Sequence, residues 1–435
     1  MNNDRNVEYN KLAHQYIPGG AHTYSRGDDQ YPSNAPKILS SGQGAYVWDV
    51  DQNKFLDFGM ALRAVTLGYN REEISRAAIA EILNGNNLTR ASQTEVLAAK
   101  EFCEFIPWVE MVKFGKNGSN VVTAATKLAR AYTGRKLIAR CADHPFYSFD
   151  DWFIGDTVVN SGVPSEIKNL TLKFAFNDLT SVEELFIKYP NQIACIVTEP
   201  ATSVEPKPGF LKGLIDIAHS NGAIVIFDEM ITGFRWHNQG ACAYYDVKPD
   251  LVTFGKAMAN GFSVAALGGK KEIMELGGLK HDKERVFLMS TTHGGEMCSL
   301  GALRATISFY KANDVVGHLW RIGKQLIDGL NQAALLHGIE KYFVAEGTPC
   351  SPSFVCKDIE GNISLPLRTL FMQEMVAQGV LIPWISLSFS HTKSDIDFAI
   401  EAASNAFSIY KKALELGSEK YLVGASVKPV FRKFN

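Results

Sequence analysis

The chain has 435 residues and a formal net charge of −2; 46% of its residues are hydrophobic and 21% are charged. These proportions are those of a globular protein, and the length argues for two or three structural units. No basic stripe indicates nucleic-acid binding, and no apolar run approaches the roughly 18 residues of a membrane span. The seven cysteines are widely spaced without a C-x-x-C pair, so we expect reduced thiols in a cytoplasmic protein.

The first 40 residues predict a short helix that ends near Tyr16, followed by an irregular stretch. Ile17-Pro18-Gly19-Gly20 interrupts regular structure, and Arg26 follows on the same loop. A solvated arginine is the simpler interpretation of Arg26 from the sequence alone.

Residues 45–58 alternate apolar and polar side chains around a polar turn, which predicts a hairpin. Within the turn, Asp49 and Asp51 imitate the start of a calcium-binding loop. Lys54 and Met60, however, occupy the positions where such a loop needs a glycine and a bidentate glutamate. We therefore expect a plain turn here and no metal ion in the protein.

Arg63 follows the hairpin in the stretch Met60-Ala61-Leu62-Arg63-Ala64. Burying an arginine among small and apolar side chains is expensive unless its charge is compensated. We expect either a carboxylate of the protein or an anionic group of a ligand beside it, and the sequence favours neither alternative.

The loop Asn117-Gly118-Ser119 is predicted to open directly into a helix. Apolar residues recur with the helical period from Val121 to Tyr132, and Gly134 is a natural stop. The loop would then present backbone N–H groups at the positive end of the helix dipole, an arrangement that suits an anion. A plain helix cap is the alternative, because the patterns G-x-x-x-x-G-K-[ST] and G-x-G-x-x-G are both absent.

The middle of the chain alternates short buried-type strands with helices. A strand is expected near 136–140, and the aromatic cluster at 143–153 would provide core filler or a ring that stacks on a flat cofactor. Residues 193–198 form the next strand, which ends at Glu199, and residues 211–221 form a helix. This order implies a parallel sheet with right-handed crossovers.

Two further apolar runs complete this pattern, one from Gly222 to Asp228 and one from Leu251 to Lys256. The carboxyl ends of parallel strands form the ligand-binding edge of a sheet, so both charged side chains should lie there. Lysine amines form Schiff bases with carbonyl groups, and pyridoxal phosphate needs such a lysine together with an acid for its pyridinium nitrogen. A structural ion pair between Asp228 and Lys256 is the alternative.

Beyond Lys256, a polar loop at 290–295 precedes a long helical region from about 296 to 337. The last third of the chain mixes short strands with a helix over 394–416, which Gly417 ends. This region has the pattern of a small domain and carries no obvious catalytic group.

Together these segments resemble the class III pyridoxal-phosphate aminotransferases, most of all their glutamate-1-semialdehyde aminomutase subgroup. The most specific segments are 227–235 and 253–257, and the segments 17–20 and 127–135 add to the likeness. The resemblance implies an α/β protein with the fold-type I (aspartate aminotransferase-like) fold of pyridoxal-phosphate transferases. That fold has a large domain with a mixed or parallel sheet and a small α+β domain.

In chain order, the resemblance implies an N-terminal arm over 1–60 that joins the small domain, a large cofactor-binding domain over 61–310 and a C-terminal small domain over 311–435. A homodimer with the active site at the subunit interface is usual in this family. The expected partners are therefore a small-molecule amino donor and a carbonyl acceptor, with neither nucleic acid nor a membrane.

The resemblance also implies cofactor roles for individual residues. Lys256 would form the internal aldimine with pyridoxal 5′-phosphate and shuttle the proton. Asp228 would pair with the pyridine nitrogen, and Asn117, Gly118 and Ser119 would cradle the phosphate.

Five other positions match residues that line the site in the family. Phe146 falls where an aromatic ring covers the cofactor, and Met230 where a branched aliphatic residue packs beneath it. Glu199 would be a second acid near the ring, and Thr292 matches a threonine that reaches the phosphate from the neighbouring subunit. Arg26 matches the arginine that grips the substrate carboxylate, which suits its planar fork.

Some positions depart from the aminomutase. Leu62 stands in place of a tryptophan, Phe146 replaces a tyrosine, and Arg63 has no counterpart, which makes it a second candidate for a substrate anion. We therefore expect an aminotransferase that moves an amino group from a donor such as L-glutamate to a carbonyl acceptor bearing carboxylate or hydroxyl groups. An intramolecular aminomutase is the alternative enzyme. A catalytically silent binding protein is the third interpretation, but it has no need of Lys256 and Asp228.

Overall fold

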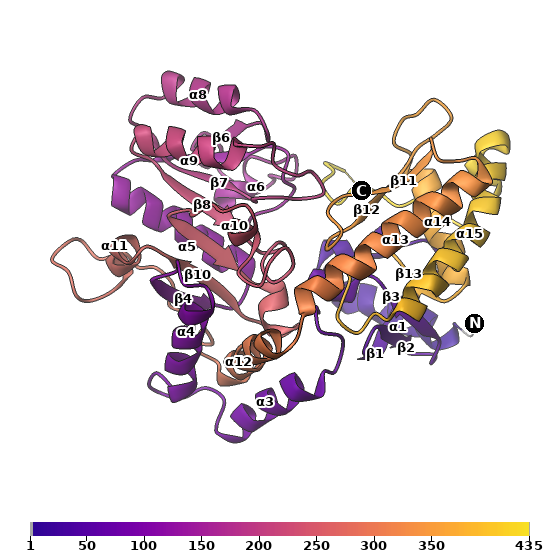
Figure 1. The fold of residues 1–435 in the computed structure, drawn as a ribbon, viewed down its shortest axis with the longest axis horizontal. Helices are drawn as coiled ribbons and strands as arrows, with labels where there is room; N and C mark the ends of the chain where they lie inside the picture. Colours follow the sequence, from indigo (N-terminus) through magenta and orange to yellow (C-terminus); the bar gives the residue numbers. More distant parts are fainter. Residues whose placement is uncertain (1–2, 435) are drawn as a thin grey trace. The chain divides into compact units, whose positions relative to one another are not determined.

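The computed structural model describes residues 3–434, and the chain folds into two compact units. Residues 3–71 and 317–432 form one of them, which we call the terminal unit, and residues 72–316 form the other, the sheet unit. Figure 1 shows that the terminal unit contains both the earliest and the latest segments of the chain. Among the described residues, no helix is long and apolar enough to cross a membrane.

A seven-stranded sheet forms the centre of the sheet unit, in the order β4-β10-β9-β8-β7-β5-β6. β10 runs antiparallel to both of its neighbours, while β9, β8, β7, β5 and β6 pair in parallel, so the expected mixed sheet is confirmed. The strands are β4 (Met111–Gly115), β5 (Leu137–Cys141), β6 (Thr171–Phe174), β7 (Ile193–Thr198), β8 (Ile224–Asp228), β9 (Leu251–Phe254) and β10 (Ala265–Gly269).

Helices cover both faces of this sheet, and Figure 1 shows α9 and α5 on opposite sides of β8. Apolar residues of α9 pack against Val225 and Phe227 of β8. Because successive strand residues point to opposite faces, Asp228 lies on the face away from α9. The helices are α3 (Glu72–Leu83), α4 (Gln93–Phe105), α5 (Gly118–Thr133), α6 (Asp151–Ile154), α7 (Ser165–Lys168), α8 (Leu179–Lys188), α9 (Phe210–Ser220), α10 (Ala241–Tyr244), α11 (Lys271–Met274) and α12 (Met297–Ala312).

The terminal unit combines a four-stranded sheet, in the order β1-β2-β3-β13, with long helices. The predicted hairpin is confirmed, because β2 and β3 pair antiparallel. The predicted helix at the start of the chain is α1, and the helix predicted at 394–416 is α15. The elements are α1 (Asp4–Tyr16), β1 (Leu39–Gln43), β2 (Tyr46–Asp49), β3 (Lys54–Asp57), α2 (Met60–Arg63), α13 (Val315–His337), β11 (Phe343–Glu346), β12 (Ser353–Cys356), α14 (Leu365–Ala377), β13 (Val380–Leu381) and α15 (Lys393–Leu416).

The helical region predicted from about 296 to 337 is confirmed, and it consists of the two helices α12 and α13. Asn313 has an extended backbone (φ −136°, ψ 146°) between α12 and α13. Its side-chain Nδ2 donates a hydrogen bond to the carbonyl of Phe309 (3.0 Å), one of the acceptors left open at the end of α12. Asparagine competes in this way with helix continuation, so the interruption has a local cause.

The turn α2 after β3 is left-handed. Its four residues all have positive φ, from 40° at Met60 to 67° at Arg63, a conformation that costs roughly 1–2 kcal/mol per residue. The Asp57 carboxylate accepts hydrogen bonds from the N–H groups of Gly59 (2.7 Å) and Met60 (3.0 Å). The indole of Trp384 donates to the Gly59 carbonyl (3.0 Å). Buried hydrogen bonds at the start of the turn therefore hold a strained backbone in place.

Replacing Ala61 with glycine should stabilise the protein by about 0.5–1 kcal/mol, because glycine relieves the left-handed strain by more than it loses in chain entropy. The free energy of unfolding in denaturant measures this change. Gly134→Ala is the reciprocal control, since Gly134 has a φ of 69° and no atom within 4 Å of an added Cβ. It should destabilise by a similar amount. A less stable Ala61→Gly variant would contradict the strain assigned to α2.

Candidate active site

The carboxylate of Asp228 ends β8 and is 3% exposed. Its Oδ1 atom accepts hydrogen bonds from the N–H of Met230 (3.0 Å) and from Thr253 Oγ1 (3.0 Å) on the neighbouring strand. Burial raises the pKa of Asp228 to about 6, although the positive charge of Lys256 acts in the opposite direction. A buried carboxylate that is held through one oxygen is suited to accept a hydrogen bond from a cationic N–H group with the other oxygen.

Lys256 follows β9 as the first residue of a short 3-10 turn (Lys256–Ala259) and has a φ of 44°. β8 and β9 are parallel, and their register places Asp228 opposite Thr253. Lys256 therefore lies three residues beyond the partner of Asp228 on the adjacent strand. Both side chains reach the same edge of the sheet, as expected. A left-handed backbone at a residue other than glycine is costly, and such residues are concentrated at functional sites.

The loop before α5 has the expected form of a capped helix start. Asn117 Oδ1 accepts a hydrogen bond from the N–H of Asn120 (3.0 Å), and Gly134 ends the helix in the left-handed conformation. Ser119 is buried, and its Oγ accepts a hydrogen bond from the N–H of Phe149 (3.0 Å). The first N–H groups of a helix have no acceptor within the helix, so the cup formed by Asn117–Ser119 can bind an anion.

The side chain of Met230 links the cup to the two charged strand ends. A Cβ placed on Gly118 would lie 3.1 Å from Met230 Sδ, and a Cβ on Gly255 would lie only 2.6 Å from the same atom. The thioether therefore packs against the cup on one side and against the residue before Lys256 on the other. Close approach of Met230, rather than unusual backbone dihedrals, explains glycine at these two positions.

Phe146 is 46% exposed, and its ring meets Phe153 edge to face at 5.6 Å between centroids. The next residue, Tyr147, is 2% exposed. Burial raises the pKa of Tyr147 well above its ordinary value, and the nearby carboxylates of Glu199 and Asp228 add to the rise. The aromatic segment thus supplies one accessible ring and one buried hydroxyl beside the acids.

Glu199 directly follows β7 and is 3% exposed. Its backbone N–H donates to Nδ1 of the buried His144 (3.1 Å), which also pairs with the Tyr147 hydroxyl (2.9 Å). Burial lowers the pKa of His144 to about 4, so the imidazole is neutral at physiological pH. His144 and Tyr147 carry no recognisable signal in the sequence, because a histidine before a proline in an aromatic cluster has no distinctive spacing.

Thr292 is exposed in the loop that precedes α12. Its carbonyl accepts a hydrogen bond from Asn87 Nδ2 (3.1 Å), so its backbone is fixed although its side chain is open to solvent. Within residues 3–434, no group of three His, Cys, Asp or Glu side chains is arranged to hold a metal ion.

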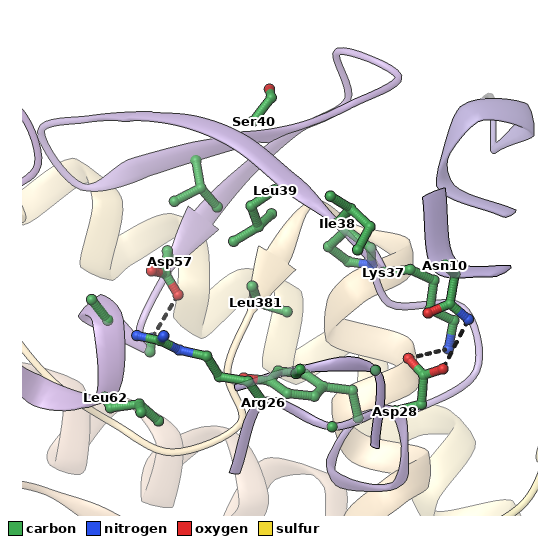
Figure 2. Close-up of a pocket in the computed structure, with 18 of the residues that line it drawn as sticks. Asn10, Arg26, Asp28, Lys37, Ile38, Leu39, Ser40, Asp57, Leu62 and Leu381 are labelled. Carbon is green, nitrogen blue, oxygen red and sulfur yellow. Dashed lines mark hydrogen bonds and ion pairs between the residues drawn. The ribbon is translucent and has the colours of Figure 1, made fainter. Parts of the chain in front are cut away.

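Arg26 belongs to the terminal unit, where it lines a cavity of about 480 Å³. Figure 2 shows its side chain extending across this cavity with the guanidinium directed toward Asp57. At the far end, Asp28 pairs with Lys37 (3.6 Å) and accepts a hydrogen bond from Asn10 (2.9 Å). The other lining residues include Tyr31, Leu62, Tyr69, Leu381 and Trp384. The cavity thus combines apolar side chains with charged ones, namely Arg26, Asp28, Lys37 and Asp57.

Arg63 lies in the left-handed turn α2, and its guanidinium donates a hydrogen bond to Ser351 Oγ (2.8 Å). Arg63 is not among the residues that line the cavity around Arg26. The two candidate arginines, Arg26 and Arg63, therefore have different surroundings.

The family model described as Aminotransferase class-III matches residues 29–385. The chain belongs to the class III aminotransferases. This membership confirms the resemblance inferred from the sequence, and with it an enzyme that transfers amino groups with pyridoxal 5′-phosphate as its cofactor.

Known relatives match the chain over most of their length. The chain is 30% identical over 431 residues to a glutamate-1-semialdehyde 2,1-aminomutase of Syntrophobacter fumaroxidans, covering 94% of this chain and 98% of that one. It is 34% identical over 335 residues to a protein of the same name from Francisella philomiragia, covering 74% and 76% of the two chains.

Solved structures confirm the expected fold. The FumI protein of Sphingopyxis sp. MTA144, described in its PLP internal aldimine form, superposes with a TM-score of 0.87 at 24% identity and covers 95% of this chain and 98% of its own. A glutamate-1-semialdehyde aminomutase of Pseudomonas aeruginosa PAO1 gives a TM-score of 0.80 at 18% identity, with 93% and 94% covered. The α/β fold of pyridoxal-phosphate transferases is therefore the fold of this chain.

The raised pKa of Asp228 predicts a pH-dependent stability difference between the cofactor-free wild type and Asp228→Asn. A carboxyl group whose pKa is higher in the folded state stabilises the fold only while it is protonated. The wild type should lose on the order of 2 kcal/mol relative to the variant as the pH rises from about 4 to about 6, with little change above. Denaturant unfolding at each pH measures the difference. A difference that does not vary with pH would contradict the burial assigned to Asp228.

Proposed function

We propose that the chain is an aminotransferase in which Asp228, Lys256 and the cup Asn117–Ser119 hold the cofactor. The observation that carries this proposal is the arrangement at one edge of the sheet. A buried carboxylate and a lysine lie at the ends of adjacent parallel strands, and Met230 packs against Gly118 of the cup and Gly255 beside the lysine. This arrangement fits pyridoxal phosphate, which has a phosphate, a pyridinium nitrogen and an aldehyde at its periphery.

When bound, the cofactor supplies an aldehyde that takes up an amino group and a ring that withdraws electrons from the substrate. The residues of the chain have distinct tasks around it. Asp228 Oδ2 holds the proton on the ring nitrogen, and the N–H groups of the cup bind the phosphate at the positive end of α5. Lys256 Nζ would take a proton from the carbon that bears the substrate amine and deliver it on the other side of the nitrogen, to the carbon that the cofactor aldehyde supplies, which is a 1,3-proton transfer.

Further residues orient the ring and limit the access of water. Phe146, with its accessible ring, would cover the cofactor ring, and Met230 would pack beneath it. Glu199 lies in the buried polar cluster with Tyr147 and His144, where it would be a second acid near the cofactor ring. Thr292 binds the phosphate that belongs to a second copy of the chain.

The second copy follows from a proposed homodimer. Helix α3 leaves Ile79, Ile82 and Leu83 exposed, at 54%, 52% and 82% of their surface. Neighbouring exposed apolar side chains are typical of protein–protein contacts. An exposed Thr292 side chain on a fixed backbone also fits a role toward another subunit.

The overall reaction exchanges an amino group for a carbonyl oxygen. A donor such as L-glutamate leaves as its 2-oxo acid, and the acceptor, a carbonyl compound with carboxylate or hydroxyl groups, leaves as an amine. An intramolecular aminomutase is the second candidate, and the names of the relatives from Syntrophobacter and Francisella favour it.

Adding L-glutamate to the cofactor-loaded protein should bleach its visible absorption and release one equivalent of 2-oxoglutarate per site. Lys256→Ala should abolish both effects, whereas Lys270→Ala, at a lysine paired with Asp250, should retain them. A band that ignores L-glutamate but responds to glutamate-1-semialdehyde would establish the aminomutase instead. A wild-type protein that binds no pyridoxal phosphate would contradict the proposed site.

We also propose that Arg26 binds a carboxylate of the substrate, because its planar fork projects into a cavity of about 480 Å³. The substrate carboxylate would share the guanidinium with Asp57, toward which the fork is directed (Figure 2). Arg63 remains the second candidate, although it already donates to Ser351.

Arg26→Ala should raise the KM for an acidic substrate by about 10- to 100-fold, the value of a charge-assisted hydrogen bond, with a smaller effect on kcat. Arg63→Ala serves as the matched control. An amine substrate without a carboxylate should be unaffected by either variant. A KM that rises only in Arg63→Ala would transfer the role to that residue.

A further inference from the structure

Lys116, directly before the cup, forms an ion pair with Glu296, 180 positions later in the chain. The two side chains are only 19% and 24% exposed. Lys116 Nζ also donates to Ser299 Oγ (3.2 Å), and the Lys116 carbonyl accepts a hydrogen bond from Ser263 Oγ (2.7 Å). The residue that leads into the cup is therefore held through both its side chain and its main chain.

Asn86 holds Glu296 from the other side. Its Nδ2 donates to Glu296 Oε1 (3.0 Å), and its Oδ1 accepts from the N–H of Cys298 (3.0 Å). Its carbonyl accepts from the N–H of Met297 (2.7 Å). The hydrogen bond from Lys116, together with that from Asn86, keeps the pKa of Glu296 below its ordinary value, so the carboxylate is charged at neutral pH. Each oxygen of this carboxylate has its own donor.

Asn87 extends the network to Thr292. Its Nδ2 donates to the Thr292 carbonyl (3.1 Å) and lies 3.4 Å from His293 Nδ1. Because Asn86 and Asn87 are consecutive, the same short segment binds the loop before α12 at two points, Thr292 and Glu296. A continuous path of covalent and hydrogen bonds thus leads from the cup to the backbone of Thr292.

We propose that the Lys116–Glu296 ion pair is a brace that fixes the cup relative to the loop carrying Thr292, and so sets the affinity for the cofactor phosphate. This inference rests on the proposed function, in which both segments bind phosphate. In a homodimer the cup serves one cofactor and Thr292 serves the other, so the brace connects the two sites.

A simpler role for Lys116 predicts a different result. If the ammonium only attracted the phosphate through space, removing the charge of Glu296 would strengthen binding while removing that of Lys116 would weaken it. A brace fails when either partner is lost, so both substitutions should weaken binding. The sign of the effect of Glu296→Gln therefore separates the two roles.

The test is an equilibrium titration of the cofactor-free protein with pyridoxal phosphate, followed by quenching of tryptophan fluorescence. Lys116→Met and Glu296→Gln should each raise the Kd about tenfold, a coupling expected within one hydrogen-bond network. The double variant should bind no more weakly than the weaker single variant. Lys116→Arg, which keeps the charge, should stay within about threefold of wild type, and Lys116→Gln replaces Lys116→Met if that variant does not fold.

Arg304→Gln is the matched control, because Arg304 forms a bidentate pair with Glu101 at similar exposures of 31% and 26%. It should lower the melting temperature without changing the Kd. Unchanged Kd values in both single variants, tighter binding by Glu296→Gln, or independent effects in the double variant would each overturn the brace. Absence of binding by the wild type would instead overturn the proposed function.

Discussion

The parallel pairing of β8 with β9 is the constraint on which the site depends. Its register sets Asp228 opposite Thr253, and Lys256 follows Thr253 by three residues, beyond the end of β9. Sheet hydrogen bonds thereby fix the separation of a carboxylate and an amine that the sequence places 28 positions apart, since 256 − 228 = 28. β8 and β9 are both buried along their whole length, so neither strand can shift in register without exposing apolar side chains.

Packing then transmits this constraint to the anion cup. Met230 follows Asp228 by two residues, and its thioether reaches Gly118 and Gly255. A larger residue at either glycine would displace the side chain between them. Asp228, Lys256 and the cup Asn117–Ser119 come from three segments of the chain, and packing of Met230 fixes these segments relative to one another.

The site also concentrates groups that cost stability. Asp228 and Glu229 are both buried acids whose pKa values are raised by burial, and Lys256 has a left-handed backbone. Glu229 is compensated by the N–H groups of Ala241 (2.8 Å) and Cys242 (2.7 Å), whereas Asp228 retains an oxygen for a ligand. The adjacent acids thus differ in how their carboxylates are bound: backbone N–H groups bind both oxygens of Glu229, whereas Asp228 is held through Oδ1.

The sequence predicted the parts of the site that depend on local pattern. Asp228 and Lys256 ended recognisable strands, and Asn117 with Gly134 framed a recognisable helix. Contacts between distant segments leave no such pattern, so the Lys116–Glu296 pair and the contact of His144 with Glu199 could not be predicted. The left-handed turn α2 was equally hidden, because none of its residues is glycine and its conformation depends on Asp57 and Trp384.

The most direct test of the account is to reduce the cofactor-loaded protein with borohydride and to map the labelled peptide by mass spectrometry. Reduction makes the bond between the cofactor and its lysine permanent, so the mass increment marks the residue that holds it. The account predicts a single phosphopyridoxyl group on Lys256. A label on another lysine, or no label on a protein that binds the cofactor, would contradict it.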